Sequence, residues 1–290
     1  MSHDALTLRP ISGTLGAEVT GADVRDVDDG LFEQIHAALL EHEVLFFRDT
    51  KLSDEQHLAL AERWGSVSVF PLMRALGSNE PSFQVIEDGP DSPPAADQWH
   101  TDVTWTPEPP KVALLRATLV PERGGDTLWG SMTAAYDALS APIKTLLEGL
   151  LVHHDSSEFV TSVVKKVGPE QAKELNIEEK LNALYPGVDH PMIRTHPETG
   201  KRAILFGGGF MRYVVGLESH ESDAILRMVT AHIEQPRFHC RWNWSPGDLA
   251  IWDERSTVHR AIGDHFPRRR EVRRCVVDGN RPYFDATVAA

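Results

Sequence analysis

The sequence has 290 residues, of which 41% are hydrophobic and 25% are charged, and its formal net charge at pH 7 is −14. This composition is typical of a globular protein, and the length suffices to bury a full core. The acidic balance argues against a surface that binds nucleic acid, but it leaves room for a small basic pocket that takes an anion.

The cysteines and the apolar runs bear on where the protein works. Cys240 and Cys275 have no metal-type spacing and are too few for a disulfide framework, which predicts a reducing, cytoplasmic setting. Residues 1–20 lack the apolar core of a signal peptide, and no apolar run approaches the length of a membrane span. We therefore expect no membrane partner, and we leave a homo-oligomer open.

The first part of the chain predicts short strands, two helices and a long apolar strand. Residues 6–24 alternate loosely between polar and apolar and contain three glycines, as short edge strands do. Apolar residues recur at helical spacing over 29–43, and Ser53 with Gln56 has the form of a capping box that starts a second helix. Further strands are predicted at 44–47, 82–86 and 111–120.

The later part of the chain predicts more strands than helices. The apolar spacing predicts a helix over 133–150 that Pro142 interrupts, and another over 219–234. Turn residues at 197–200 and at 245–248 each predict a β-hairpin. The predicted strands are 127–129, 151–154, 192–195, 203–206, 238–244, 249–252 and 271–277.

Together these elements predict a mainly β fold with flanking helices, a sandwich or barrel, in a single domain over residues 1–290. The sequence shows no regular strand–helix–strand alternation, internal repeat or linker. Residues 156–189 are strongly polar with weak periodicity, which indicates an insertion of helices and loop. We interpret this insertion either as a lid over a site or as a solvated surface excursion.

A histidine and an aspartate stand two residues apart in a segment rich in aromatic and β-branched residues, 98–105. This composition favours an extended backbone, in which His100 and Asp102 point to the same side. A metal bound there requires a third ligand from elsewhere, and His259 is the best candidate. Two histidines and one carboxylate on one face leave coordination positions open, which is the pattern of non-haem Fe(II) oxygenases.

A basic run near the end of the chain supplies candidate anion sites. On an extended strand Arg270, Val272 and Arg274 share a face. One arginine could bind the distal carboxylate of 2-oxoglutarate through its fork of N–H groups, and another could bind an anionic substrate. A solvated face is the alternative interpretation of this run.

Four blocks of the sequence resemble the taurine dioxygenase (TauD/TfdA) family of 2-oxoglutarate-dependent oxygenases and occur in the same order. These blocks are Trp99–Thr104, Gly124–Trp129, Arg241–Asp248 and Ile251–Arg274. The resemblance covers nearly the whole chain. It implies a double-stranded β-helix, or jelly-roll, core. It also implies an enzyme that uses Fe(II), 2-oxoglutarate and O2 to hydroxylate a small anionic substrate, releasing succinate and CO2.

The same resemblance implies roles for particular residues. His100, Asp102 and His259 would bind the iron, and Thr127 and Arg270 would hold the distal carboxylate of 2-oxoglutarate. No catalytic residue is expected beyond the metal ligands. The positions expected at the substrate site are Arg274, Phe70, Met73, Phe210 and Trp244. For the last two, a place beside the co-substrate and a packing role are the alternatives.

Phe70 and Met73 depart from the taurine-using members, which carry a histidine and a tyrosine in this segment. Apolar side chains in place of two polar partners favour a longer alkyl sulfate, sulfonate or carboxylate over taurine. Taurine and a role in taurine catabolism stay an option. Two other functions are open as well, a zinc hydrolase that activates water with the same triad and a non-catalytic metal-binding barrel. Neither gives a role to Thr127 and Arg270.

Overall fold

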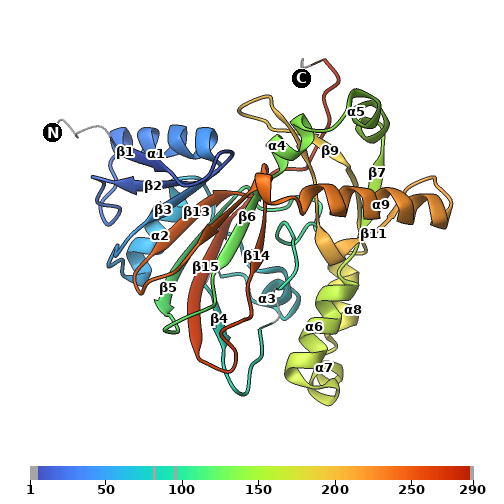
Figure 1. Cartoon of the computed structure of the whole chain (residues 1–290). Coiled ribbons are helices and arrows are strands. Elements are labelled where there is room, and N and C mark those ends of the chain that lie inside the picture. The colour runs from blue at the N-terminus through green and yellow to red at the C-terminus, as the bar shows by residue number, and fades with distance from the viewer. Residues whose placement is uncertain (1–5, 81–82, 95–96, 288–290) are drawn as a thin grey trace.

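The computed structural model describes residues 6–80, 83–94 and 97–287. Two sheets of mainly antiparallel strands stand at its centre, and helices lie on their outer sides (Figure 1). A second group of short strands and helices lies beside them, and further helices extend away from the sheets (Figure 1). This arrangement confirms the mainly β fold with flanking helices, and it is consistent with a jelly-roll core.

The larger sheet combines strands from both halves of the chain. In the described residues its order is β1-β2-β3-β13-β5-β15-β4, antiparallel except between β2 and β3. Its strands are β1 (Thr7–Pro10), β2 (Ala17–Thr20), β3 (Val44–Phe47), β4 (Gln84–Asp88), β5 (Val112–Leu119), β13 (Leu249–Asp253) and β15 (Arg270–Val277). Ser82, where the sequence placed the start of a strand, lies outside the described residues, and the observed strand is β4.

The smaller sheet faces the larger one across a layer of aromatic rings. Its antiparallel strands are, in order, β12 (His239–Trp242), β6 (Thr127–Ser131) and β14 (Thr257–Ala261). The fully buried ring of Trp129 on β6 lies 5.2 Å from that of Phe46 and 5.7 Å from that of Trp252, both on the larger sheet. Truncating such a side chain costs roughly 3–5 kcal/mol, so these rings anchor the two sheets to each other.

The hairpin predicted around residues 245–248 is wrong, although the turn itself forms. β12 pairs with β6 in the smaller sheet, whereas β13 pairs with β3 and β5 in the larger one. The Asp248 carboxylate holds the turn, because it accepts hydrogen bonds from the Ser245 amide at 2.8 Å and from the Trp242 indole at 3.2 Å. Burial of Trp242 between the sheets outweighs the local turn signal, and the chain crosses from one sheet to the other.

Two helices cover the outer face of the larger sheet, as the sequence predicted. α1 (Asp29–His42) directs one apolar stripe at the sheet, formed by Leu31, Ile35, Ala38 and Leu39. α2 (Asp54–Glu62) begins with the predicted capping box. The Ser53 hydroxyl accepts from the Gln56 amide at 3.2 Å, and the Gln56 side chain accepts from the Ser53 amide at 2.9 Å.

The second group of strands and helices encloses a separate apolar cluster. Its elements are α4 (Met132–Asp137), α5 (Ala141–Glu148), β7 (Leu151–His154), β8 (Val188–Pro191), β9 (Ile193–Thr195), β10 (Arg202–Ile204), η1 (Gly208–Phe210), β11 (Met211–Val214), α9 (Ser219–Ile233) and η2 (Pro236–Phe238). Pairing of β9 with β10 confirms the hairpin at 197–200. The helix predicted over 133–150 is two helices, and Pro142 lies in the first turn of the second.

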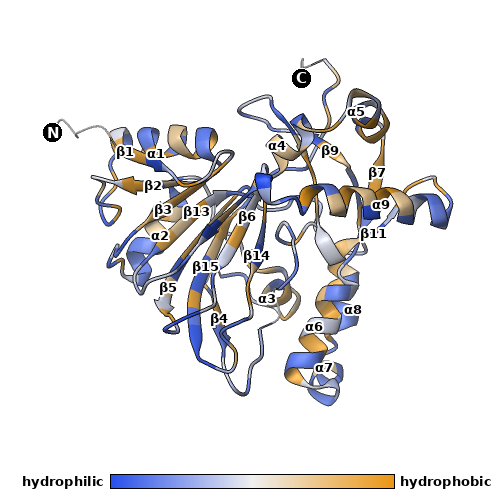
Figure 2. Cartoon of the chain, in the orientation of Figure 1, coloured by the Kyte–Doolittle hydropathy of each residue, from blue (hydrophilic) through white to orange (hydrophobic). Residues whose placement is uncertain are grey.

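The polar segment 156–189 contains three helices that extend away from the sheets (Figure 1). They are α6 (Ser157–Val167), α7 (Pro169–Glu174) and α8 (Ile177–Leu184). Each carries hydrophobic residues beside hydrophilic ones (Figure 2). Their buried side chains cluster with Val103 and Trp105, and α8 also contacts α3 (Pro71–Ala75). The insertion is therefore packed against the segment that follows Asp102.

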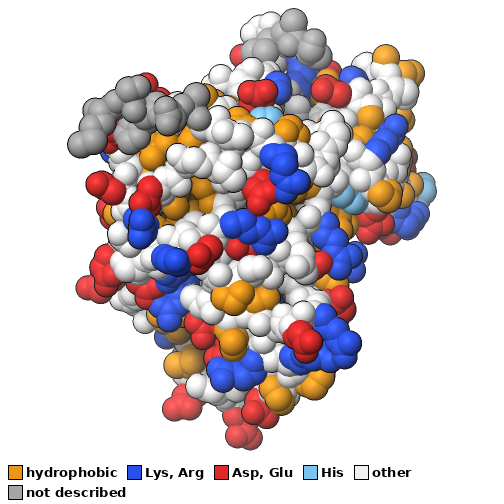
Figure 3. All heavy atoms as spheres, turned by 60° about the vertical axis from the view of Figure 1, so that its left-hand side comes forward, with side chains coloured by type: hydrophobic (Ala, Val, Ile, Leu, Met, Phe, Trp, Pro, Cys, Tyr) orange, Lys and Arg blue, Asp and Glu red, His pale blue; other side chains and the backbone are white. Residues whose placement is uncertain are grey.

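Charged side chains of both signs share the face of the molecule shown in Figure 3. Exposed ion pairs such as Arg63 with Asp29, 2.6 Å apart, are of the kind that contributes 0–1 kcal/mol or so each to stability. Across the described residues, no helix combines the length and the apolar character that a membrane crossing requires.

Candidate active site

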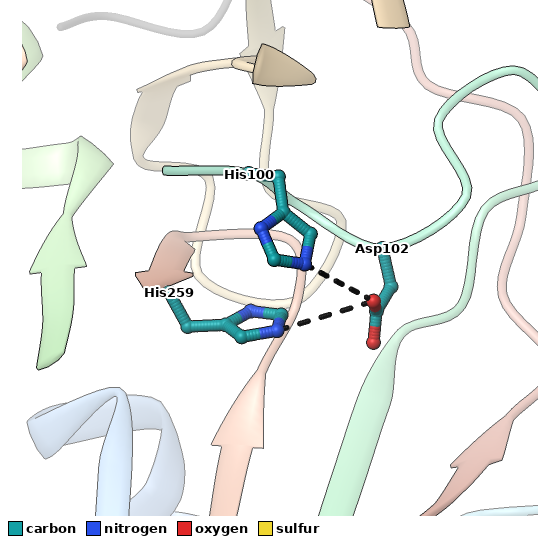
Figure 4. Close-up of side chains that lie close together, drawn as sticks. All are labelled: His100, Asp102 and His259. Carbon is teal, nitrogen blue, oxygen red and sulfur yellow. Dashed lines mark ion pairs between the residues drawn. The ribbon is translucent and has the colours of Figure 1, made fainter. Parts of the chain in front are cut away.

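The three residues predicted to bind metal come together from two distant parts of the chain (Figure 4). His259 lies on β14, and His100 pairs with it as an isolated antiparallel bridge, with backbone hydrogen bonds of 3.1 and 2.9 Å. The extended backbone predicted over 98–105 is wrong beyond this bridge, because residues 102–105 form a turn in which Val103 has a φ of +43°. Burial of Trp105 beneath the helical insertion bends the segment away from the sheet.

The ligand atoms of this triad converge on one point. One nitrogen from each of His100 and His259 and one oxygen of Asp102 all lie within 4.8 Å of one another. The Nε2 atoms of His100 and His259 are 3.7 Å and 3.9 Å from Asp102 Oδ1, as Figure 4 shows. This spacing leaves room for an ion between the three side chains.

The protonation of the two imidazoles suits metal binding. His100 Nδ1 lies 2.8 Å from the Gln98 carbonyl, which can only accept, so Nδ1 carries the proton and Nε2 keeps its lone pair. Burial lowers the pKa of His100, and burial together with the nearby His100 lowers the pKa of His259 well below its ordinary value. Neutral imidazole is the form that binds a metal ion.

Asp102 is held from two sides. Nη1 of Arg274 donates to both of its carboxylate oxygens, at 2.7 and 2.6 Å, and the Asp102 amide donates to the Glu254 side chain at 3.2 Å. Burial raises the pKa of the Asp102 carboxyl, but the charge of the adjacent Arg274 prevails and holds it at about 2. The carboxylate is therefore ionised, as a metal ligand must be.

A second cluster lies around Arg270 on β15, whose side chain is buried. Its Nε donates to the Gly125 carbonyl at 3.0 Å, and its Nη2 lies 3.5 Å from Thr127 Oγ1, which also accepts from the Trp244 indole at 3.0 Å. Asp88 is 3.8 Å from Nη1. Gly125 has a φ of +74°, and a Cβ there would lie 2.9 Å from Arg270 Cδ, so this close approach requires glycine.

Two cavities meet at Arg274. One cavity of about 240 Å³ has His100 in its wall and is named the inner cavity, and the other, of about 320 Å³, is named the outer cavity. Phe70, Asp102, Val103 and Arg274 line both cavities. Other aromatic side chains in their walls are Phe159 and Phe210 in the inner cavity and Tyr185 in the outer one.

Of the predicted substrate-site residues, Phe70, Phe210 and Arg274 lie at these cavities, and two do not. Met73 is 42% exposed, and neither it nor Trp244 is among the described residues that line the cavities. Met73 lies on the outer side of the short helix α3, and Trp244 is buried next to Thr127. The structure thus separates Met73 from Phe70, although both stand in one sequence segment.

Two residues near Asp102 were not found from the sequence. Gln84 on β4 lies opposite Arg274 in the register of β15, and its side-chain oxygen accepts from Arg274 Nε at 2.9 Å. Glu254 follows β13 and carries a buried carboxyl group. An acid directly after an apolar strand was a signal that could have marked Glu254, whereas nothing in the sequence pairs Gln84 with Arg274.

Comparison with known proteins places this arrangement in a family. The family described as taurine catabolism dioxygenase TauD, TfdA family matches residues 7–276. An alkylsulfatase of Acinetobacter baylyi is 35% identical over 276 residues, which cover 94% of this chain and 85% of that protein. An alpha-ketoglutarate-dependent sulfate ester dioxygenase of Pseudomonas putida is 32% identical over 279 residues, covering 96% and 91%.

A solved structure agrees with this result. The crystal structure of a taurine dioxygenase from Burkholderia xenovorans matches with a TM-score of 0.79 and 31% identity, over 97% of this chain and 93% of that one. The chain belongs to the TauD/TfdA family.

Family and ligand set together define the chemistry. Two neutral histidines and one carboxylate with converging atoms fit Fe(II), and alpha-ketoglutarate is 2-oxoglutarate. The protein is an oxidoreductase, a dioxygenase that depends on Fe(II) and 2-oxoglutarate and consumes O2. The zinc hydrolase and the non-catalytic barrel are not favoured, because the family is one of dioxygenases and because neither function uses the buried Arg270 beside Thr127.

Proposed function

We propose that the substrate is a small organic anion with an apolar body, such as an alkyl sulfate, an alkyl sulfonate or a carboxylate. The observation that carries this proposal is the position of Arg274, a cation at the junction of the inner and outer cavities. Phe70 stands beside it in both walls. An anionic head pairs well with arginine, and each methylene buried against the aromatic walls contributes about 0.8 kcal/mol.

The relatives support the same class of substrate. Two of them are named as an alkylsulfatase and a sulfate ester dioxygenase. Taurine stays an option, since a structural relative is a taurine dioxygenase. A small zwitterion would bury little against Phe70 and Phe210, so taurine catabolism is the less favoured role.

In this proposal Thr127 and Arg270 hold the distal carboxylate of 2-oxoglutarate. Because Gly125 fixes the Nε end of the guanidinium, the two Nη groups are already oriented for a carboxylate. The Trp244 indole orients the Thr127 hydroxyl in the same way. Little side-chain freedom is then lost when the co-substrate binds.

His100, Asp102 and His259 bind Fe(II) in this proposal. The iron, with O2 and 2-oxoglutarate, supplies the oxidising power, and the products besides the hydroxylated substrate are succinate and CO2. The chain's own part is to hold the ligands in place, to fix the substrate anion at Arg274 and to keep water out with aromatic walls. No further side chain is required as a proton donor or acceptor.

We further propose that residues 156–189 act as a lid on a single domain. Phe159 of α6 lines the inner cavity, and its ring lies 5.6 Å from Phe70 and 5.5 Å from Trp105. Tyr185, just after α8, lies 5.3 Å from Trp105 and lines the outer cavity. These contacts support the proposal that the segment closes over both cavities when substrate is present.

A cytoplasmic setting also belongs to this proposal. Cys240 and Cys275 are buried and free, and burial raises the pKa of each thiol to about 12. Free thiols are typical of proteins in a reducing compartment such as the cytoplasm. Because a raised pKa keeps these two thiols protonated, they are also unreactive.

The experiment is an assay of succinate released from 2-oxoglutarate in the presence of Fe(II), with candidate substrates added one at a time. The set includes taurine, hexyl and octyl sulfate, the matching sulfonates and medium-chain carboxylates. We expect substrate-dependent succinate release with the apolar anions, lost on chelation of the metal. Taurine turned over more efficiently than every apolar anion would overturn the proposed substrate class.

A further inference from the structure

Glu254 is a buried acid whose side chain reaches the backbone of a metal ligand. It is 2% exposed, its Oε2 accepts from the Asp102 amide at 3.2 Å, and its Oε1 accepts from the Trp252 indole at 2.7 Å. The bond to Asp102 joins residues 152 positions apart in the chain. It therefore ties the turn that carries Asp102 to the end of β13.

The support for Glu254 is rigid. Its own amide donates to the Lys111 carbonyl at 3.0 Å, and the preceding Asp253 amide donates to the Glu43 carbonyl at 3.0 Å. Asp253 is further held by Arg255, whose Nη2 is 2.6 Å from its carboxylate. An anchor fixed at this many points can define the position of whatever its side chain binds.

The turn at Asp102 needs such an anchor. Val103 adopts a left-handed backbone conformation, which is strained for a residue other than glycine. The Asp102 amide, which an extended strand would have paired with a backbone carbonyl, donates to the Glu254 side chain instead. Without that acceptor the amide would be buried and unpaired. This is unfavourable, so the turn would be expected to rearrange.

We propose that Glu254 is a positioning residue for the metal site. It fixes the backbone at Asp102 so that the carboxylate faces His100 and His259, while Arg274 holds the carboxylate itself. This inference rests on the proposed ligation of Fe(II) by the triad. Outer residues that orient metal ligands typically change metal affinity by 10–100-fold or so when they are replaced.

Two substitutions test the bond separately from the presence of an acid. Glu254→Gln has one acceptor oxygen, so it satisfies either Asp102 or Trp252 but not both. Glu254→Asp keeps an acid with both oxygens, but it is one methylene shorter and withdraws from the Asp102 amide. The matched control is Glu43→Gln, another buried acid, whose carboxyl group interacts with Ser131 and Thr133.

The measurement is calorimetric titration of the metal-free full chain with Mn(II), together with the melting temperature of each metal-free variant. We expect Mn(II) affinity to fall by at least about ten-fold in both Glu254 variants and by less than about two-fold in Glu43→Gln. The absorption spectrum of the Co(II) form should also change in the Glu254 variants. That spectrum reports ligand geometry, which a purely structural role would leave unchanged.

Several results would overturn the inference. These are wild-type Mn(II) affinity in either Glu254 variant, a deficit confined to Glu254→Gln, which would indicate that an acid is required whatever its reach, or an equal deficit in Glu43→Gln. Loss of the folded state in both Glu254 variants would assign the residue to the fold. His259→Ala serves as the reference for ligation. If it bound Mn(II) as the wild type does, the ligand assignment would fail first and the inference with it.

Discussion

Nη1 of Arg274 donates to both carboxylate oxygens of Asp102, at 2.7 and 2.6 Å. The remaining nitrogens of the guanidinium reach the side-chain oxygen of Gln84, so the cation is fixed at the junction of the two cavities. A substrate anion that binds there meets a charge already shared with Asp102. Arg274 therefore links the proposed metal ligand to the proposed substrate site.

Replacing Arg274 by alanine should weaken the binding of the proposed anionic substrate far more than the binding of 2-oxoglutarate. Removal of the charge partner of a desolvated anion costs roughly 2–5 kcal/mol, so we expect kcat/KM for octyl sulfate to fall at least ten-fold or so. The adjacent Arg273 is the control, since it points to the other face of β15 and pairs with Asp54. A loss of the same size in Arg273→Ala would contradict the assigned role of Arg274.

Arg270→Ala should act on the co-substrate. Its guanidinium is buried beside Thr127, and we expect the affinity for 2-oxoglutarate, measured by calorimetry on the Mn(II) form, to fall at least ten-fold or so. Arg270→Lys should recover only part of this affinity because the planar fork of N–H groups is lost. Unchanged 2-oxoglutarate affinity in Arg270→Ala would remove this residue from the co-substrate site.

The fold class and the convergence of the triad could be predicted because both depend on patterns carried by the sequence itself. Apolar strand runs and the alternation that puts Arg270, Val272 and Arg274 on one strand face are local signals. The turn after Asp102 could not be predicted in this way, since burial of Trp105 under the helical insertion overrides the β propensity of its neighbours.

Contacts between residues far apart in the chain could not be predicted from the sequence for a related reason. The hairpin over 238–252 failed because each strand finds its partner in a different sheet, and that choice depends on the packing of Trp242 and Trp252. In the same way, the bond from Glu254 to Asp102 depends on how β13 is placed by its neighbours. Local pattern identifies such residues only as buried or exposed.

The lid proposal predicts a difference in hydrogen exchange. The helices of residues 156–189 contact the rest of the chain through one apolar cluster, in which Phe159 lies against Phe70 and Trp105. We expect their amides to exchange faster than those of β3 and β13, and to gain protection when Mn(II), 2-oxoglutarate and substrate bind. Equal protection in the free and bound states would leave the segment as ordinary surface.

Stability should fall in acid partly through His154. Burial first, and then the neighbouring His190 and His153, lower its pKa to about 3, whereas in the unfolded chain it is about 6.5. Between these values the unfolded chain binds a proton that the folded chain does not. The free energy of unfolding therefore drops as the pH falls below 6.5, by up to about 1.4 kcal/mol per pH unit.

A pH interval above the pKa of the unfolded chain provides the control for this prediction. The free energy of unfolding, measured in urea with chelator at pH 7.0 and 5.5 or so, should lose about 1.3 kcal/mol less in His154→Asn than in the wild type. Between about pH 8.5 and 7.5 His154 is neutral in the folded and the unfolded chain, so the two proteins should show the same change there. The same pH dependence in wild type and His154→Asn would refute the argument.

Phe70 forms part of the apolar wall of the cavities, and the nearby Met73 is its matched control. Phe70 lines both cavities, and its ring lies 5.6 Å from that of Phe159, whereas Met73 is exposed outside them. Removing a phenylalanine that buries a substrate chain loses roughly 1.5–3 kcal/mol. We therefore expect Phe70→Ala to lower kcat/KM for octyl sulfate by about 10- to 100-fold, and to lower it much less for a short anion. Met73→Ala should change kcat/KM by no more than about two-fold for both substrates. The free energy of such a change is well below the 1.4 kcal/mol or so that corresponds to a ten-fold change. Equal effects of the two substitutions would mean that the substrate does not lie against Phe70.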